Sequence, residues 1–223
     1  MKIGLVYTST TKELTETVNQ ELVKQIGPDA ELLNYQDASI LADTRAAGYV
    51  TPQAAVKLYS LYLQAAADGA DAILNICSSV GEAADAMQDA AAYIGIPIVR
   101  IDTEMCREAV RLGSRIAVLA TLPTTLEPTK QTIRRMAREL GRPVELIDGL
   151  IDGAFGLDPA EFKALLIEKA MSLNEQADVI LLCQGSMAYC EADLYRHCRK
   201  PVLSSPRFGA AALKQALIAK GEM

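Results

Sequence analysis

The stretch Ala-Asp-Ala-Ile-Leu-Asn-Ile-Cys, residues 70–77, decides the fold class, because it is a short apolar run bounded by turn residues. Gly69 lies directly before this stretch, and Ser78 and Ser79 follow it. Strands that are buried on both faces of a parallel sheet read as nearly continuous apolar runs of this kind. The flanking residues 52–68 and 82–94 have helical patterns, so the segment is predicted to be a strand between two helices.

The same alternation extends through the first hundred residues. Apolar runs predict strands over residues 3–7, 31–34 and 96–101, and an amphipathic pattern predicts a helix over residues 12–26. Strands that alternate with helices indicate βαβ units and therefore a parallel sheet. Residues 45–49, which include Arg45 and Tyr49, are predicted to lie in a loop before Pro52, with Arg45 as a candidate partner for a second substrate carboxylate.

The pattern then returns in the second half of the chain. Residues 177–183 read Ala-Asp-Val-Ile-Leu-Leu-Cys, and four further matches occur in the same order along the chain. Pro52 lies 19 residues before Asp71, and Pro159 lies 19 residues before Asp178. The equivalent residues Asp71 and Asp178 are 107 residues apart. This period is too long for a solenoid and indicates a duplication. The predicted fold is α/β, with two similar doubly wound parallel-sheet domains related by a pseudo-twofold axis.

Composition excludes several functional classes. The 223 residues correspond to about one and a half domains of ordinary size. The net charge of −6 and the absence of a basic run argue against nucleic acid as a partner. The apolar runs are far shorter than the ~20 residues of a membrane span, and there is no signal-peptide pattern. The five cysteines, without a CxxC pair, indicate reduced thiols in a cytoplasmic protein.

Ligands of parallel α/β sheets bind beyond the carboxyl ends of the strands. In the first half these ends carry Thr8, Ser9, Thr10, Asn75, Cys77, Ser78 and Ser79; in the second half they carry Thr121, Thr124, Thr125, Cys183, Gln184 and Gly185. The helices that follow present amino-terminal N–H groups, which suit a carboxylate. We therefore expect an anion-binding cleft between the halves, with one cysteine on each side.

Two opposed thiols suggest a definite chemistry. One thiolate would remove the proton next to a carboxylate, and the other thiol would deliver a proton to the opposite face, with no metal or pyridoxal cofactor. The simpler alternatives are that the cysteines are buried structural residues and that the hydroxyl groups are helix caps. Cys106, Cys190 and Cys198 have no matching partners in the repeat, and we expect them to be structural.

These segments resemble the cofactor-independent aspartate/glutamate/hydantoin racemase superfamily over nearly the whole chain. The resemblance is carried by residues 8–10, 75–79, 120–125 and 182–186. It implies that Cys77 and Cys183 are the two acid/base residues and that the neighbouring polar residues hold the substrate. It also implies that the last helix returns to the first domain, which gives domains of residues 1–102 plus 207–223 and 103–206, and a possible homodimer.

The sequence thus predicts a racemase or epimerase that acts at the α-carbon of a small carboxylate such as aspartate or glutamate, or on a hydantoin. Cys-Ser-Ser stands where amino-acid racemases of this group commonly have Cys-Asn-Thr, and Cys-Gln-Gly stands where glutamate racemases have Cys-Thr-His. The alternatives are a decarboxylase or cis–trans isomerase of a small acid that uses one cysteine, or a non-catalytic acid-binding protein with redox-sensitive thiols.

Overall fold

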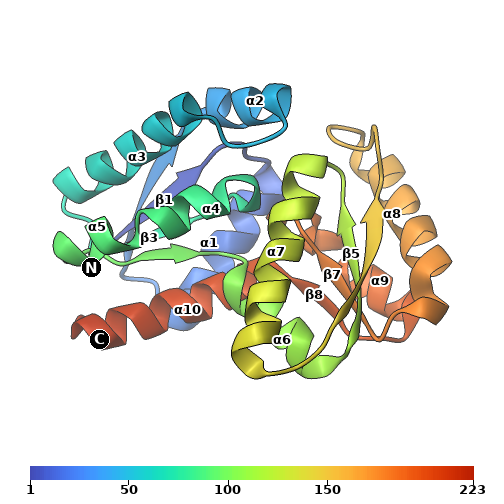
Figure 1. Ribbon diagram of the computed structural model, residues 1–223. Coiled ribbons are helices and arrows are strands. Elements are labelled where there is room, and N and C mark those ends of the chain that lie inside the picture. The colour runs from blue at the N-terminus through green and yellow to red at the C-terminus, as the bar shows by residue number, and fades with distance from the viewer. The chain divides into compact units, whose positions relative to one another are not determined.

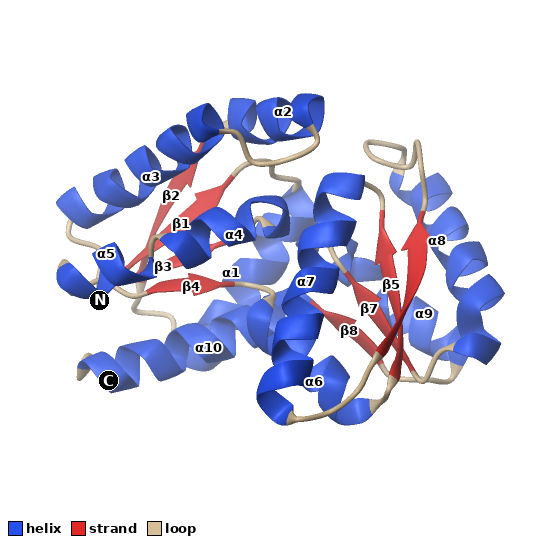
Figure 2. Cartoon of the chain, viewed as in Figure 1, coloured by secondary structure: helices blue, strands red, loops and turns tan.

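Two parallel sheets of the same topology form the framework of the protein. The computed structural model describes all 223 residues, which divide into two compact units. Unit 1 comprises Met1–Ile101 and Pro206–Met223, and unit 2 comprises Asp102–Ser205. Each unit is a four-stranded sheet flanked by helices (Figure 1, Figure 2). The predicted α/β class with two similar parallel sheets is therefore confirmed.

The sheet of unit 1 has the strand order β2-β1-β3-β4. Its strands are β1 (Lys2–Tyr7), β2 (Glu31–Gln36), β3 (Ala72–Asn75) and β4 (Ile98–Arg100). Its helices are α1 (Lys12–Ile26), α2 (Ala38–Ala47), α3 (Pro52–Ala67), the 3-10 turn η1 (Ser78–Val80), α4 (Gly81–Ala86), α5 (Gln88–Tyr93) and α10 (Ser205–Lys220), whose first residue belongs to unit 2.

The sheet of unit 2 has the corresponding order β6-β5-β7-β8. Its strands are β5 (Arg115–Ala120), β6 (Glu145–Leu150), β7 (Val179–Leu182) and β8 (Val202–Ser204). Its helices are α6 (Thr103–Leu112), α7 (Pro123–Leu140), α8 (Pro159–Leu173), η2 (Asn174–Gln176), η3 (Gly185–Cys190) and α9 (Glu191–Cys198).

The alternation of side chains along each strand separates two cores in unit 1. Ala72, Leu74 and Ile76 face α1 and α10, where they pack with Leu14 and Leu213 among others. The intervening Ile73 faces α3 and α4, and Cys77 lies at the edge of this second core. Successive residues of a strand point to opposite faces of the sheet, so a shift of one residue exchanges the two cores.

The helices that close the sheets are exchanged between the halves of the sequence. Helix α6 follows β4 of unit 1 but belongs to unit 2, and α10 follows β8 of unit 2 but packs in unit 1. Figure 1 shows the red α10 among the blue and green elements of unit 1. Gly209 permits this packing, because a Cβ atom there would lie 2.8 Å from Ile101 Cα.

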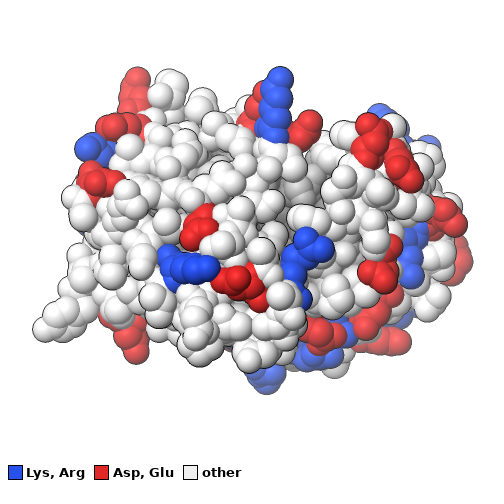
Figure 3. Space-filling model, turned by 90° about the horizontal axis from the view of Figure 1, so that it is seen from above, with Lys and Arg blue, Asp and Glu red and all other residues white.

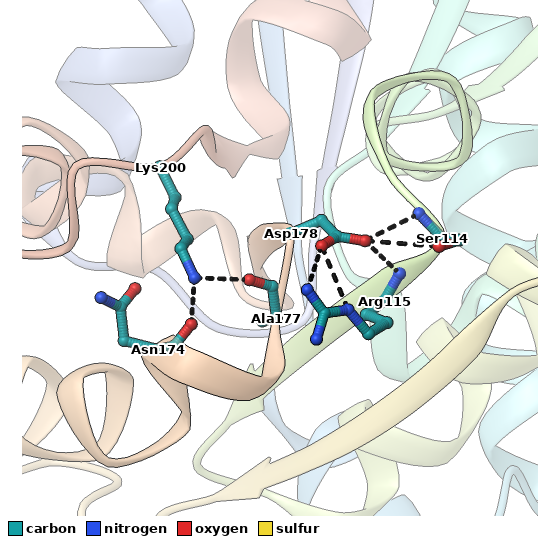
Figure 4. A network of polar contacts seen from close by, with 6 residues as sticks. All are labelled: Ser114, Arg115, Asn174, Ala177, Asp178 and Lys200. Carbon is teal, nitrogen blue, oxygen red and sulfur yellow. Dashed lines mark hydrogen bonds and ion pairs between the residues drawn. The ribbon is translucent and has the colours of Figure 1, made fainter.

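The amino-terminal edge of each sheet is fixed by an aspartate that precedes the central strand. In unit 2, Asp178 accepts hydrogen bonds from the backbone N–H groups of Ser114 and Arg115 and forms an ion pair with the Arg115 guanidinium (Figure 4). In unit 1, Asp71 accepts a hydrogen bond of 2.7 Å from Lys2 N. These aspartates lie at the strand ends opposite to the predicted site, so the repeat preserves them as structural residues.

Two predicted segments differ from the structure. Residues 38–47, part of which were predicted to form a loop, are helix α2, because Asp37 accepts a hydrogen bond of 2.9 Å from Ser39 N and Gly48 ends the helix with a φ of 82°. Arg45 and Tyr49 are both exposed, Arg45 in the last turn of this helix and Tyr49 just beyond it. The single helix predicted over 82–94 is divided at Met87 into α4 and α5.

The surface carries mixed charges. In Figure 3, lysine and arginine side chains lie among aspartate and glutamate side chains rather than in one broad basic area. Lys57 and Asp43 form one such pair, with 2.7 Å between Nζ and Oδ2. None of the helices is both long enough and apolar enough to cross a membrane.

Candidate functional site

Cys77 lies two residues beyond the end of β3, the central strand of unit 1, and directly before η1. Its side chain is partly exposed, whereas the neighbouring Ser78 and Ser79 are buried. The backbone N–H groups of Ser79 and Val80 and the hydroxyl group of Ser79 donate hydrogen bonds toward the sulfur. The turn that follows the strand therefore surrounds one thiol with hydrogen-bond donors.

These donors counteract the effect of burial on the thiol. Burial raises the pKa of Cys77 above its usual value, while the hydroxyl group of Thr8 and the donors from Ser79 and Val80 act to lower the pKa. The Thr8 hydroxyl is buried and has no hydrogen bond of ordinary geometry to another group. Buried polar groups are normally paired, so this hydroxyl is available to the sulfur or to a ligand beside it.

Two consecutive buried hydrogen bonds hold the Cys77 backbone in place. Tyr62 on α3 donates a hydrogen bond of 2.9 Å to Asn75 Oδ1, and Asn75 Nδ2 donates one of 3.1 Å to the Cys77 carbonyl oxygen. Both side chains are about 1% exposed. Asn75 is predicted to bind substrate, and its amide is hydrogen-bonded on both sides within unit 1.

A buried arginine fixes the helix that follows the thiol. The Arg100 side chain is only 4% exposed and forms an ion pair of 2.6 Å with Asp85 on α4. Its guanidinium covers the backbone of Gly81, the first residue of α4, because a Cβ atom there would lie 2.4 Å from Arg100 Cζ. Removal of the Asp85 charge would deprive the buried Arg100 guanidinium of this ion pair, which is destabilising.

Cys183 does not occupy the place in unit 2 that Cys77 occupies in unit 1. The Ile76 N–H donates to the Val6 carbonyl at 2.9 Å, and the Cys183 N–H donates in the same way to the Leu119 carbonyl at 2.9 Å. Val6 and Leu119 are equivalent, since they pair with the last residues of β3 and β7. The expectation that the two cysteines stand at matching positions is therefore wrong: Cys183 corresponds to Ile76.

The shift of one residue places Cys183 on the other face of its sheet. Leu182 belongs to the core beneath α8 and α9, so the side chain of Cys183 lies on the face that carries α6 and α7. It is 0% exposed. Burial raises the pKa of the Cys183 thiol to about 12; the Thr129 hydroxyl lowers this pKa, whereas the charges of Asp102 and Asp148 raise it.

Gln184 is the residue of unit 2 that corresponds to Cys77. Its side chain is partly exposed, and it forms two hydrogen bonds with Thr121, the counterpart of Thr8. Gln184 Oε1 accepts from Thr121 N at 3.1 Å, and Gln184 Nε2 donates to Thr121 Oγ1 at 2.5 Å. The pair Thr8 and Cys77 in unit 1 thus becomes Thr121 and Gln184 in unit 2.

The remaining predicted site residues lie at the same carboxyl edges of the two sheets. In unit 1, Ser9 and Thr10 form the turn before α1, and Thr10 Oγ1 donates to Gln36 Oε1 at 3.3 Å. In unit 2, Thr124 and Thr125 are buried in the first turn of α7, and Gly185 begins η3. The Thr124 hydroxyl, like the Thr8 hydroxyl of unit 1, is buried and has no hydrogen-bond partner.

Sequence reasoning missed the residues that support the thiols. Arg100 carried a signal, because it is a charged residue inside the apolar run Ile-Pro-Ile-Val-Arg-Ile. Asp102 is the residue directly after this apolar run, and it is buried near Cys183. Tyr62 carried no such signal, because its contact with Asn75 depends on how α3 packs on the sheet.

The fold and the edge residues define a duplicated parallel α/β protein with a partly exposed thiol after the central strand of its first sheet. A family model described as Asp/Glu/hydantoin racemase matches residues 3–213. The chain therefore belongs to the Asp/Glu/hydantoin racemase family, whose reactions are those of isomerases. A comparison with curated proteins gave no match.

Solved structures share the fold across both units. The allantoin racemase from Klebsiella pneumoniae is 20% identical, with a TM-score of 0.71 and coverage of 99% of this chain and 89% of that chain. The glutamate racemase isoform RacE1 from Bacillus anthracis is 15% identical, with a TM-score of 0.73 and coverage of 98% and 82%. An unliganded arylmalonate decarboxylase is 17% identical, with a TM-score of 0.59 and coverage of 99% and 92%. At these identities the likeness establishes the fold.

Proposed function

We propose that the protein transfers a proton, without a cofactor, at the carbon next to the carboxylate of a small organic acid, with Cys77 as the acid/base residue. The observation that carries this proposal is a partly exposed thiol surrounded by the donors of Thr8, Ser79 and Val80. Membership of the racemase family supports the reaction class. The substrates that the sequence suggests are aspartate, glutamate and hydantoins.

The reaction step is a reversible proton transfer. The Cys77 thiolate takes the proton from the α-carbon, and the electron pair of the broken C–H bond enters the carboxylate to form an enediolate. The thiol then returns a proton to carbon, and the electron pair moves back into the new C–H bond. Preorganised donors that meet the developing negative charge lower the barrier to such a step. The unsatisfied Thr8 hydroxyl is a candidate for this role.

The substrate class has a specific alternative from the fold comparison. The arylmalonate decarboxylase and the allantoin racemase are both similar to this chain in fold, so malonate-like acids and ureido compounds belong in a substrate panel beside amino acids and hydantoins. A decarboxylase requires one proton donor rather than two bases, and the register that favours Gln184 over Cys183 supports it as the second candidate function. In that reaction the C–C bond breaks, carbon dioxide leaves, and the Cys77 thiol protonates the enediolate.

Hydrogen–deuterium exchange distinguishes these reactions. Each candidate acid is incubated with the protein in deuterium oxide, and NMR follows the α-proton, chiral analysis follows the enantiomers and gas analysis follows carbon dioxide. We expect exchange at the α-carbon or release of carbon dioxide by the wild type and loss of at least 10³-fold in Cys77→Ala. Cys198→Ala, which removes a buried thiol of α9, is the matched control.

Each outcome identifies a different class of protein. Exchange with interconversion of enantiomers indicates a racemase, and carbon dioxide indicates the lyase. Full activity in Cys77→Ala would overturn the proposal. Absence of exchange and of carbon dioxide across the panel would also overturn it and would favour the acid-binding protein with redox-sensitive thiols.

A further inference from the structure

The duplication allows each residue of unit 1 to be compared with one position in unit 2. The two strand-end hydrogen bonds, from Ile76 N to Val6 O and from Cys183 N to Leu119 O, are both 2.9 Å long. The residue after Ile76 is Cys77, and the residue after Cys183 is Gln184. The unit 2 position equivalent to Cys77 therefore carries an amide.

From this register, and on the basis of the proposed function, we infer that the protein works with a single acid/base thiol, Cys77. Gln184 takes the place of a second acid/base residue, and Cys183 belongs to the interior of unit 2. Two independent features support this assignment: the direction of the Cys183 side chain and the hydrogen bonds of Gln184.

The direction of the side chain separates Cys183 from the carboxyl edge. Its counterpart Ile76 is a core residue that packs with α1 and α10. Cys183 is likewise fully buried, on the face of its sheet that carries α6 and α7. The charges of the buried Asp102 and the exposed Asp148 act on it and oppose formation of a thiolate. A group held in this way lacks both the access and the charge state of a base.

The hydrogen bonds of Gln184 reproduce the contact that Cys77 makes in unit 1. Thr8 lies beside the Cys77 sulfur, and its counterpart Thr121 bonds Gln184 through both its N–H and its hydroxyl group. A glutamine amide donates and accepts hydrogen bonds but does not titrate. Gln184 can therefore orient a carboxylate, but it cannot remove or deliver a proton to carbon.

The inference predicts that proton transfer takes place on one side of the substrate only. A proton removed by Cys77 returns to the same face, so an acid with an α-proton exchanges deuterium with retention of configuration. If the substrate loses carbon dioxide instead, the thiol protonates one face and gives one enantiomer. Both outcomes contrast with racemisation by two bases, in which the proton returns to the opposite face.

The first test replaces Cys183 by a residue that fills the same apolar space. Cys183→Val resembles the Ile76 of unit 1, and we expect it to retain wild-type exchange or decarboxylation within about threefold, with retention or a single enantiomer. Circular dichroism and a urea titration check that the variant folds. A folded Cys183→Val variant that loses activity at least 100-fold, or a wild type that interconverts enantiomers, would overturn the inference.

A second test needs no substrate and separates failure of this inference from failure of the proposed function. Native protein and Gln184→Cys are treated with iodoacetamide, and the modified cysteines are identified by mass spectrometry. We expect Cys77 to react in both, the new thiol of Gln184→Cys to react at a rate within tenfold of Cys77, and Cys183 to stay unmodified. Modification of Cys183 as fast as Cys77, or an unreactive thiol in Gln184→Cys, would overturn the inference even if no substrate were found.

Discussion

The carboxyl ends of the two central strands have the same backbone and opposite chemistry. In unit 1, β3 ends in a polar assembly in which Tyr62, Asn75 and the Cys77 backbone are joined by hydrogen bonds. In unit 2 the residue equivalent to Asn75 is Leu182, which is fully buried in an apolar core. The thiol of unit 1 is partly exposed among donors, whereas that of unit 2 is enclosed near two carboxylates. Duplication preserved the sheet but not the arrangement of polar groups at its edge.

This difference shows which features a repeat retains. The aspartates that fix the amino-terminal edges, Asp71 and Asp178, are present in both units because each satisfies a strand N–H group that either sheet must present. The hydrogen bonds from Tyr62 to Asn75 and from Asn75 to the Cys77 backbone occur only in unit 1, the unit that carries the partly exposed thiol.

The pH dependence of activity gives the largest expected effect. Burial raises the pKa of Cys77, so at neutral pH only a small fraction is thiolate, and the rate of proton abstraction should rise about tenfold per pH unit below that pKa. We expect kcat/KM to increase about 100-fold between pH 6.5 and pH 8.5, measured with the best substrate of the panel. Dependence on Cys183, whose pKa burial raises to about 12, would extend the rise to higher pH than dependence on Cys77. A flat profile would contradict the assignment of a thiolate base.

Gly81→Ala disturbs the start of α4, the helix that follows Cys77 and η1 in the chain. The added Cβ atom would lie 2.4 Å from Arg100 Cζ, so the guanidinium must move and its buried ion pair with Asp85 is disturbed. We expect a loss of up to ~3 kcal/mol in the free energy of unfolding by urea titration, with a larger proportional loss of kcat than of binding. The control Glu82→Ala changes the next residue, which is exposed, and should be near wild type. A stable and active Gly81→Ala variant would show that Arg100 is not needed there.

Tyr62→Phe removes the hydroxyl group that donates to Asn75, and it leaves the buried Asn75 Oδ1 without this hydrogen bond. The expected cost is about 1–2 kcal/mol of stability. Because Asn75 in turn donates to the Cys77 carbonyl, we also expect the rate of Cys77 alkylation and its pH midpoint to change, whereas Cys183 should be unaffected. Tyr59→Phe is the matched control, since its ring packs 6.4 Å from that of Tyr62. An unchanged Cys77 midpoint in a destabilised Tyr62→Phe variant would limit Tyr62 to a structural role.

Asp178→Asn has the smallest expected effect, because the ion pair with Arg115 is exposed. The Arg115 guanidinium holds the pKa of Asp178 well below its usual value. A carboxyl group with a lowered pKa stabilises the fold above its unfolded pKa of about 4 and loses that contribution as the pH falls further. Thermal unfolding should show a lower midpoint for Asp178→Asn at pH 7 and a smaller difference from wild type near pH 3. A difference that grows toward low pH would contradict this sign.

The framework of the protein could be predicted from the sequence, because apolar runs and helical patterns report burial directly. The helix over residues 12–26 and the repeated Ala-Asp run were found in this way. Helix α2 was missed because its pattern is short and depends on the Asp37 cap. The position of Cys183 was misread because both runs end in cysteine, while a difference of one residue reverses the direction of a side chain. The sequence carries this difference, since Cys77 is the sixth residue after Asp71 and Cys183 the fifth after Asp178, and the hydrogen-bond register shows that the strands do not absorb it.

The exchange of α6 and α10 has a consequence for synthesis of the chain. Unit 2 is one continuous segment, and it is complete once Ser205 has left the ribosome. Unit 1 lacks Ala210, Leu213 and Leu217 of its core until helix α10 has also emerged from the ribosome. The half that is made first therefore finishes folding last, and in the meantime the face of its sheet that α10 will cover is open to solvent and to chaperones. A stop codon within α10 would thus damage the unit that carries Cys77 and leave the other unit whole.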